Sequence, residues 1–104
     1  MAKSSVALDS IQVDPKHYKV EDETDRVRVV RAIYGPHEKS DMHSHPDLVA
    51  FLVTDGNVRF TYPDGKTEDV QMAAGQTLIM PATTHLPENL SDKPFEVVLV
   101  ELKS

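Results

Sequence analysis

The feature that most restricts the fold is a series of short segments rich in β-branched, aromatic and other apolar residues, each ended by turn residues. These segments cover residues 26–34, 48–53, 58–62, 67–72, 77–80 and 95–102. The residues between them include Gly35-Pro36, Asp55-Gly56, Pro63-Asp64-Gly65 and Ala74-Gly75. Such residues are typical of tight turns, and Asp55-Gly56 predicts a turn of the hairpin type. No segment keeps a helical apolar period over three turns. The sequence therefore predicts seven or eight short strands in an all-β sandwich or barrel.

The length of the chain, 104 residues, suits one domain. Residues 1–15 form an N-terminal arm in this interpretation, ending at Asp14-Pro15, and residues 16–104 form the barrel. Ile11 and Val13 alternate with polar residues, so the arm could add a short strand to a sheet edge; a frayed terminus is the alternative.

Composition excludes several classes of function. The net charge is -6, from 11 basic and 17 acidic residues, and no basic stripe appears, which argues against a nucleic-acid partner. The absence of cysteine excludes disulfides, thiolate zinc sites and a cysteine nucleophile. The N-terminus lacks a signal-peptide pattern and the apolar runs are too short to span a membrane. We expect a cytoplasmic protein without a membrane partner.

Three of the five histidines form a candidate metal site. His43 and His45 are two residues apart, and side chains at i and i+2 of a strand point to the same face. His85 follows forty residues later, where a barrel could bring it alongside. Neutral imidazoles bind divalent metals, and we expect one ion, Zn, Fe, Ni or Mn. The alternative is a set of surface-loop histidines. His17 and His37 lie in polar surroundings and are expected to be exposed.

These residues resemble the two motifs of the cupin superfamily. The first motif is written G-x5-H-x-H-x3-4-E-x6-G, and here Gly35, His43, His45 and Gly56 follow it with two extra residues after the first glycine. The second is written G-x5-P-x-G-x2-H-x3-N, and Gly75, Pro81, His85 and Asn89 follow it, one residue short, with Thr83 at the glycine position. The chain is most similar to short single-domain bacterial cupins. The resemblance implies a small antiparallel double-stranded β-helix, the jelly-roll barrel of cupins.

The family's glutamate ligand is missing, because Val49, with three residues between it and His45, stands in its place. We expect Val49 to lie beside the cavity, sharing strand parity with His43 and His45, and to leave one coordination position open. Asp47 and Glu88 are candidate fourth ligands. Asn89 either orients His85 or substrate through a hydrogen bond, or stabilises a turn. A three-histidine site without the glutamate is similar to that of cupin-type thiol dioxygenases.

The resemblance leaves catalysis open, because cupins host many activities. One hypothesis is a metalloenzyme of oxygenase type acting on a small anionic metabolite, with no catalytic residue beyond the metal ligands identified. A site without the carboxylate is one unit more positive and should attract anions. The alternatives are a non-catalytic, metal-dependent ligand-binding or sensing cupin, and a structural cupin that has lost its metal. A homodimer is expected in each case, because an open barrel leaves sheet edges to cover.

Overall fold

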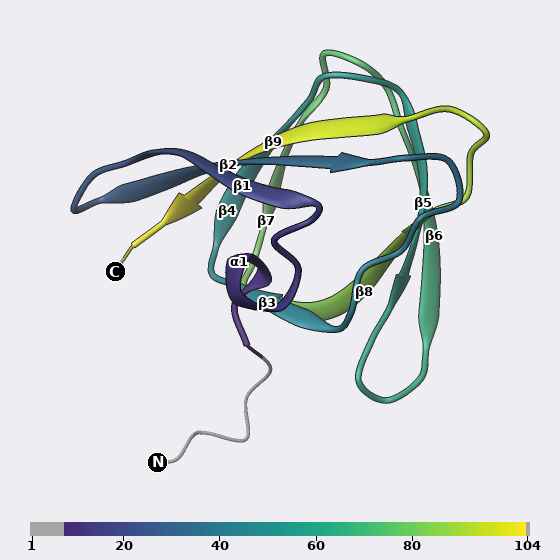
Figure 1. Cartoon of the computed structure of the whole chain (residues 1–104), viewed down its shortest axis with the longest axis horizontal. Coiled ribbons are helices and arrows are strands. Elements are labelled where there is room, and N and C mark those ends of the chain that lie inside the picture. The colour runs from purple at the N-terminus through teal and green to yellow at the C-terminus, as the bar shows by residue number, and fades with distance from the viewer. Residues whose placement is uncertain (1–7, 104) are drawn as a thin grey trace.

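The computed structural model describes residues 8–103, which form one helical turn and nine strands (Figure 1). In chain order these are α1 (Ser10–Val13), β1 (Tyr18–Glu23), β2 (Val27–Tyr34), β3 (His43–His45), β4 (Leu48–Leu52), β5 (Gly56–Thr61), β6 (Thr67–Met72), β7 (Thr77–Met80), β8 (Thr83–Asn89) and β9 (Phe95–Leu102). The predicted all-β class is confirmed.

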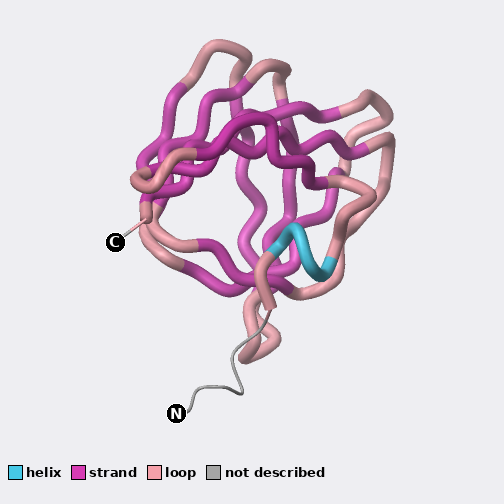
Figure 2. The backbone as a smooth tube through the Cα atoms, turned by 60° about the vertical axis from the view of Figure 1, so that its left-hand side comes forward, coloured by secondary structure: helices cyan, strands magenta, loops and turns pink. Residues whose placement is uncertain are grey.

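The strands form two sheets. One sheet has five strands in the order β1-β2-β9-β4-β7, and the other has four in the order β3-β8-β5-β6. All neighbouring strands are antiparallel. The backbone curls around a central space, with strands on both sides of it and loops at its ends (Figure 2). This is the antiparallel double-stranded β-helix that the motifs predicted.

Alternation along the strands sends one set of side chains into the barrel and the other outward. On β9, Phe95, Val97, Leu99 and Glu101 are buried, while the residues between them are only half-buried. β4 repeats this pattern with Leu48, Ala50 and Leu52 buried, and β2 pairs with β9 along its whole length. The interior is therefore built from the inward set of both sheets.

Two local predictions need correction. The segment with Ile11 and Val13 forms the helical turn α1 rather than a strand, because the Asp9 side chain accepts a hydrogen bond from the Ile11 backbone N–H (3.1 Å) and caps the turn. The arm does reach a sheet edge just before this turn, where the Ser44 N–H of β3 donates to the Leu8 carbonyl oxygen (2.9 Å). Asp55-Gly56 does not join a hairpin, because the strands on its two sides, β4 and β5, belong to different sheets. Strands β1 and β8 were not predicted. The domain boundary after residue 15 stays a prediction, and residues 1–7 lie outside the described part.

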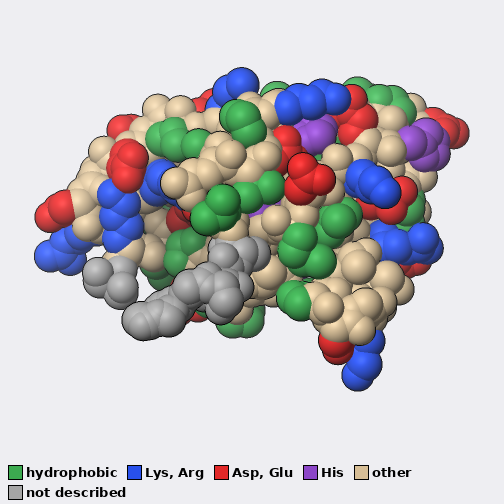
Figure 3. All heavy atoms as spheres, turned by 60° about the horizontal axis from the view of Figure 1, so that its bottom comes forward, with side chains coloured by type: hydrophobic (Ala, Val, Ile, Leu, Met, Phe, Trp, Pro, Cys, Tyr) green, Lys and Arg blue, Asp and Glu red, His purple; other side chains and the backbone are tan. Residues whose placement is uncertain are grey.

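The surface carries charges of both signs, with apolar side chains exposed between them (Figure 3). The exposed large apolar residues include Ile33, Phe51 and Ile79, all on strands of the five-stranded sheet. Over the described residues, no helix has the length and apolarity needed to cross a membrane.

Candidate metal centre

The pairing of β3 with β8 brings the three histidines together. His43 lies directly across from His85, and His45 across from Thr83. All three imidazoles are buried, whereas Ser44 and Thr84 point the other way and join their hydroxyls (2.9 Å). One ligand nitrogen from each histidine lies within 4.8 Å of the others. The structure thus assembles the predicted cluster; that it binds a metal stays a prediction.

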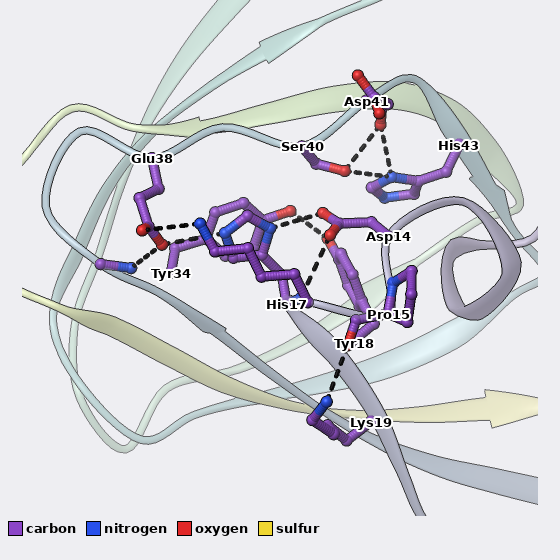
Figure 4. A network of polar contacts seen from close by, with 12 residues as sticks. Asp14, Pro15, His17, Tyr18, Lys19, Tyr34, Glu38, Ser40, Asp41 and His43 are labelled. Atoms are coloured by element: carbon purple, nitrogen blue, oxygen red, sulfur yellow. Dashed lines mark hydrogen bonds and ion pairs between the residues drawn. The ribbon is translucent and has the colours of Figure 1, made fainter.

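Hydrogen bonds fix which nitrogen each of two imidazoles can offer. The Nδ1 of His43 donates to the Asp41 carbonyl oxygen (2.9 Å), beside the Ser40 hydroxyl (2.9 Å) (Figure 4). The Nδ1 of His45 donates to the carboxylate of Glu101 (2.8 Å). Since these acceptors hold the proton at Nδ1, the lone pair of each neutral ring lies on Nε2.

The burial of the Nε2 atoms of His43 and His85 also fits a metal site. Both are buried and have no hydrogen-bond partner among residues 8–103, which is costly for a polar atom. Burial, with the neighbouring His45, lowers the pKa of His43 to about 4. Burial also lowers the pKa of His85 to about 3, helped by His45 and His43. At neutral pH both rings are neutral, the form that a metal requires.

Glu101 is a buried hydrogen-bond partner of the histidine cluster that sequence reasoning missed. Its side chain, on β9, is 1% exposed and accepts from His45 on one oxygen and from Arg28 on the other, with Arg28 Nε at 2.8 Å and a terminal guanidinium nitrogen at 2.5 Å. Arg28 also donates to Asp9 (2.5 Å). The alternation along β9 could have indicated its burial, because Glu101 occupies the next inward position after Val97 and Leu99.

The two candidate fourth ligands lie elsewhere, and both predictions are wrong. Asp47 is exposed, and its carboxylate accepts from the backbone N–H of Ala82 (2.7 Å) at the turn before β8. Glu88 alternates with the inward residues of β8 and lies across from Arg59 on β5. Neither belongs to the group of clustered ligand atoms.

Val49 does not lie beside the cavity, so that prediction is corrected as well. The inward side chains of β4 are those of Leu48, Ala50 and Leu52, which line the interior. Val49 faces outward and pairs with Ile79 and Val100. The parity argument failed because β3 ends at His45 and a new strand begins at Leu48, so alternation does not continue from one to the other. Ala50, at the family's four-residue spacing, takes the inward place.

Asn89 is buried but stabilises a loop. Its amide nitrogen donates to the carbonyl oxygens of Gly35 (3.0 Å) and Lys93 (2.8 Å), and its oxygen accepts from the Ser91 N–H (2.9 Å). It sits four residues after His85 on an extended strand, too far to orient that imidazole. Of the two roles expected for Asn89, the stabilisation of a turn is the one that these hydrogen bonds support.

A largely apolar cavity adjoins the histidines. His45, His85, Tyr18, Tyr34 and Thr83 supply its polar groups. The remaining wall is aliphatic and aromatic, from residues that include Leu52, Phe60, Met72, Leu78, Met80 and Phe95. The Phe60 ring stacks on His85, with ring centres 4.9 Å apart. The space open to the centre of a water-sized molecule is about 50 Å³, several times the room that one water needs, so the cavity can take a small ligand.

A second polar network supports the cavity wall (Figure 4). His17 is buried, contrary to expectation, and its ring stacks on Tyr34 with centres 4.2 Å apart. Its nitrogens contact Asp14 (2.6 Å) and Glu38 (3.0 Å). Tyr18 and Tyr34 join their hydroxyls at 2.7 Å, and burial raises the pKa of Tyr18 well above 10, so this hydroxyl keeps its proton.

His37 is exposed, as the sequence predicted. It contacts Asp92 (2.6 Å) in a surface pair. Of the five histidines, the two outside the cluster therefore differ: His17 is packed in the interior and His37 lies on the surface.

Comparison with known proteins agrees with the fold and its motifs. The family model for the Cupin domain matches residues 30–101, so the chain belongs to the cupin family. A cupin domain from Bordetella pertussis Tohama I is 27% identical, with a TM-score of 0.78 over 84% of this chain and 92% of that one. No curated protein matches the sequence significantly.

More distant structures share the fold. A conserved protein with a double-stranded β-helix domain from Klebsiella pneumoniae subsp. pneumoniae MGH 78578 is 20% identical, with a TM-score of 0.65 over 98% of this chain and 81% of that one. A cupin superfamily protein from Desulfitobacterium hafniense DCB-2 is 13% identical, with a TM-score of 0.61 over 100% and 84% of the two chains.

Proposed function

We propose that this cupin binds one divalent metal ion through His43, His45 and His85 and holds a small anionic molecule on the open side of that ion. The single observation that carries the proposal is the convergence of three buried imidazoles, two of them with unpartnered Nε2 atoms. Three neutral ligands leave the ion's full positive charge to attract an anion, and fewer protein ligands leave coordination positions free.

The activity we propose is that of a metalloenzyme of oxygenase type. A bound metal of this kind supplies Lewis acidity and, if redox-active, electron transfer to oxygen. The chain's own residues hold the ligand geometry: Asp41 and Glu101 keep the protons of His43 and His45 on Nδ1. The apolar wall excludes bulk water from the reacting molecule.

A non-catalytic binding or sensing role is the second candidate, and one observation favours it. The buried carboxylate nearest the site, Glu101, is already bound to His45 and Arg28. The tyrosine hydroxyls of Tyr18 and Tyr34 are bonded to each other. A reaction that needs a protein base would find none free in the described cavity wall.

Metal analysis of untagged protein tests the shared part of both candidates. We expect about one ion per chain in the wild type and a loss of binding in His43→Ala, His45→Ala and His85→Ala. His37→Ala is the matched control, because this exposed histidine should leave the metal content unchanged. Equal metal content in all four variants after chelation and reloading would contradict the site. Oxygen consumption by iron-loaded protein with bound ligand then separates the enzyme from the binding protein.

A further inference from the structure

The cavity wall restricts the anion that the proposed site can hold. The titratable side chains that line the cavity are His45, His85, Tyr18 and Tyr34. Among the described residues, no lysine or arginine lines the cavity. Arg28, the nearest buried cation along the histidine network, is turned away and neutralised by Glu101 and Asp9. Any negative charge on a ligand must therefore be balanced by the metal ion.

The polar groups of the cavity all come from one side of its lining, and the metal cluster is among them. His45 and His85 belong to the cluster, Thr83 lies directly across from His45, and the Tyr18 ring lies 4.9 Å from that of His43. The hydroxyls of Tyr18 and Tyr34 are joined to each other, and Tyr34 is also bonded to Ser40, whereas Thr83 presents a hydroxyl donor in the cavity wall. At this side of the cavity, one negatively charged group of a ligand could bind the metal and accept a hydrogen bond.

The rest of the ligand would meet hydrocarbon. Leu52, Leu78, Met80 and Phe95 lie in the wall beyond the polar groups. A second charge placed there would lose its hydration without gaining a partner, which strongly disfavours its binding. Each methylene placed there instead gains about 0.8 kcal/mol, or about fourfold in affinity.

From these observations, and resting on the proposed metal site, we propose that the cavity selects small monocarboxylates with an apolar body and rejects dicarboxylates, sugar phosphates and other doubly charged molecules. The carboxylate would take the open position of the metal and accept a hydrogen bond from the Thr83 hydroxyl. The hydrocarbon body would extend along the leucine and methionine side chains of β4 and β7.

Calorimetric titration of zinc-loaded protein with propionate, butyrate, valerate and succinate tests the selectivity. We expect affinity to rise about fourfold for each added methylene and succinate to bind at least about 30-fold more weakly than butyrate. Metal-free protein should bind none of them. Succinate affinity equal to or above that of butyrate, or no gain along the series, overturns the proposal.

A variant pair locates the effect in the cavity. Leu78→Lys places a cation in the wall of the cavity, and its ammonium can reach a distal carboxylate while the stem stays packed. It should raise succinate affinity relative to butyrate by at least about tenfold. Ile79→Lys, on the same strand but 88% exposed on the outer face, should leave the ratio at the wild-type value. An equal change in both variants contradicts the assignment.

The zinc titration that precedes these measurements keeps the two proposals distinguishable. Protein that takes up no zinc contradicts the proposed function itself. Protein that takes up one zinc ion but fails to prefer monocarboxylates contradicts only the ligand class.

Discussion

Replacing Glu101 by glutamine should weaken metal binding without removing a metal ligand. The carboxylate accepts from His45 on one oxygen and from Arg28 on the other. Glutamine has the same shape but only one acceptor oxygen. In either orientation its NH₂ group therefore faces a donor, either the Nδ1–H of His45 or the guanidinium of Arg28.

The size of the effect follows from what Glu101 does for the imidazole. A carboxylate behind a ligating histidine fixes the tautomer and raises the basicity of the ring, and losing such a partner costs about 10- to 100-fold in metal affinity. This equals about 1.4–2.7 kcal/mol. We expect the upper half of the range, because Glu101 is 1% exposed and water has little access to replace the lost bond. Global stability should also fall, by about 1–3 kcal/mol, for the unpaired buried donor.

Competition with a chelator of known affinity measures the change, using zinc or the spectroscopic substitute cobalt. Glu96→Gln is the matched control: it lies on the same strand, faces outward and pairs with Arg31, so its metal affinity should equal that of the wild type. Circular dichroism and urea denaturation confirm that each variant is folded. A folded Glu101→Gln variant with metal affinity within twofold of the wild type would refute the proposed role of this carboxylate.

Three further predictions concern pH, packing and assembly. The pKa values of His43 and His85 are lowered to about 4 and about 3, so below pH 6.5 the unfolded chain takes up protons that the folded chain does not. Urea denaturation of metal-free protein should therefore show a free energy of unfolding that falls from pH 6.5 to 5. A flat profile contradicts this. Gly56→Ala places a Cβ 2.3 Å from the Phe95 ring and should cost about 1–3 kcal/mol in the same assay, whereas an unchanged midpoint means that the ring moves freely. Sedimentation should show a homodimer that Ile79→Lys weakens if the outer sheet face is its interface; an 11.6 kDa species at high micromolar concentration is the contrary result.

The sequence predicted the architecture because its signals were local and repeated. Alternating apolar residues and turn pairs marked six strands close to their observed positions, and the two motifs identified the three clustered histidines. β1 was missed because five of its six residues, Lys19 to Glu23, are exposed and largely charged. β8 was missed because Pro87 lies within it, which ordinarily argues against a strand.

The surroundings of the histidines could not be predicted in the same way, because they depend on contacts between distant strands. Val49 was placed inward by extending the parity of His45 across a break between two strands. His17 was judged exposed from polar neighbours, yet Asp14 and Glu38 are its binding partners. Glu101, 56 residues from His45, required the pairing order of the sheet.

The direct pairing of His43 with His85 has a consequence for how this protein can vary. The relative position of the ligands is set by the hydrogen-bonded ladder between β3 and β8, rather than by the number of residues that separate them along the chain. Insertions or deletions in the connecting turns, such as the one at Gly65, would leave the histidine cluster intact as long as that ladder keeps its register. The same logic explains how a second motif one residue shorter than the family pattern still delivers His85 to its place. Tolerance to length change should therefore be high in the turns and low within residues 43–45 and 83–85.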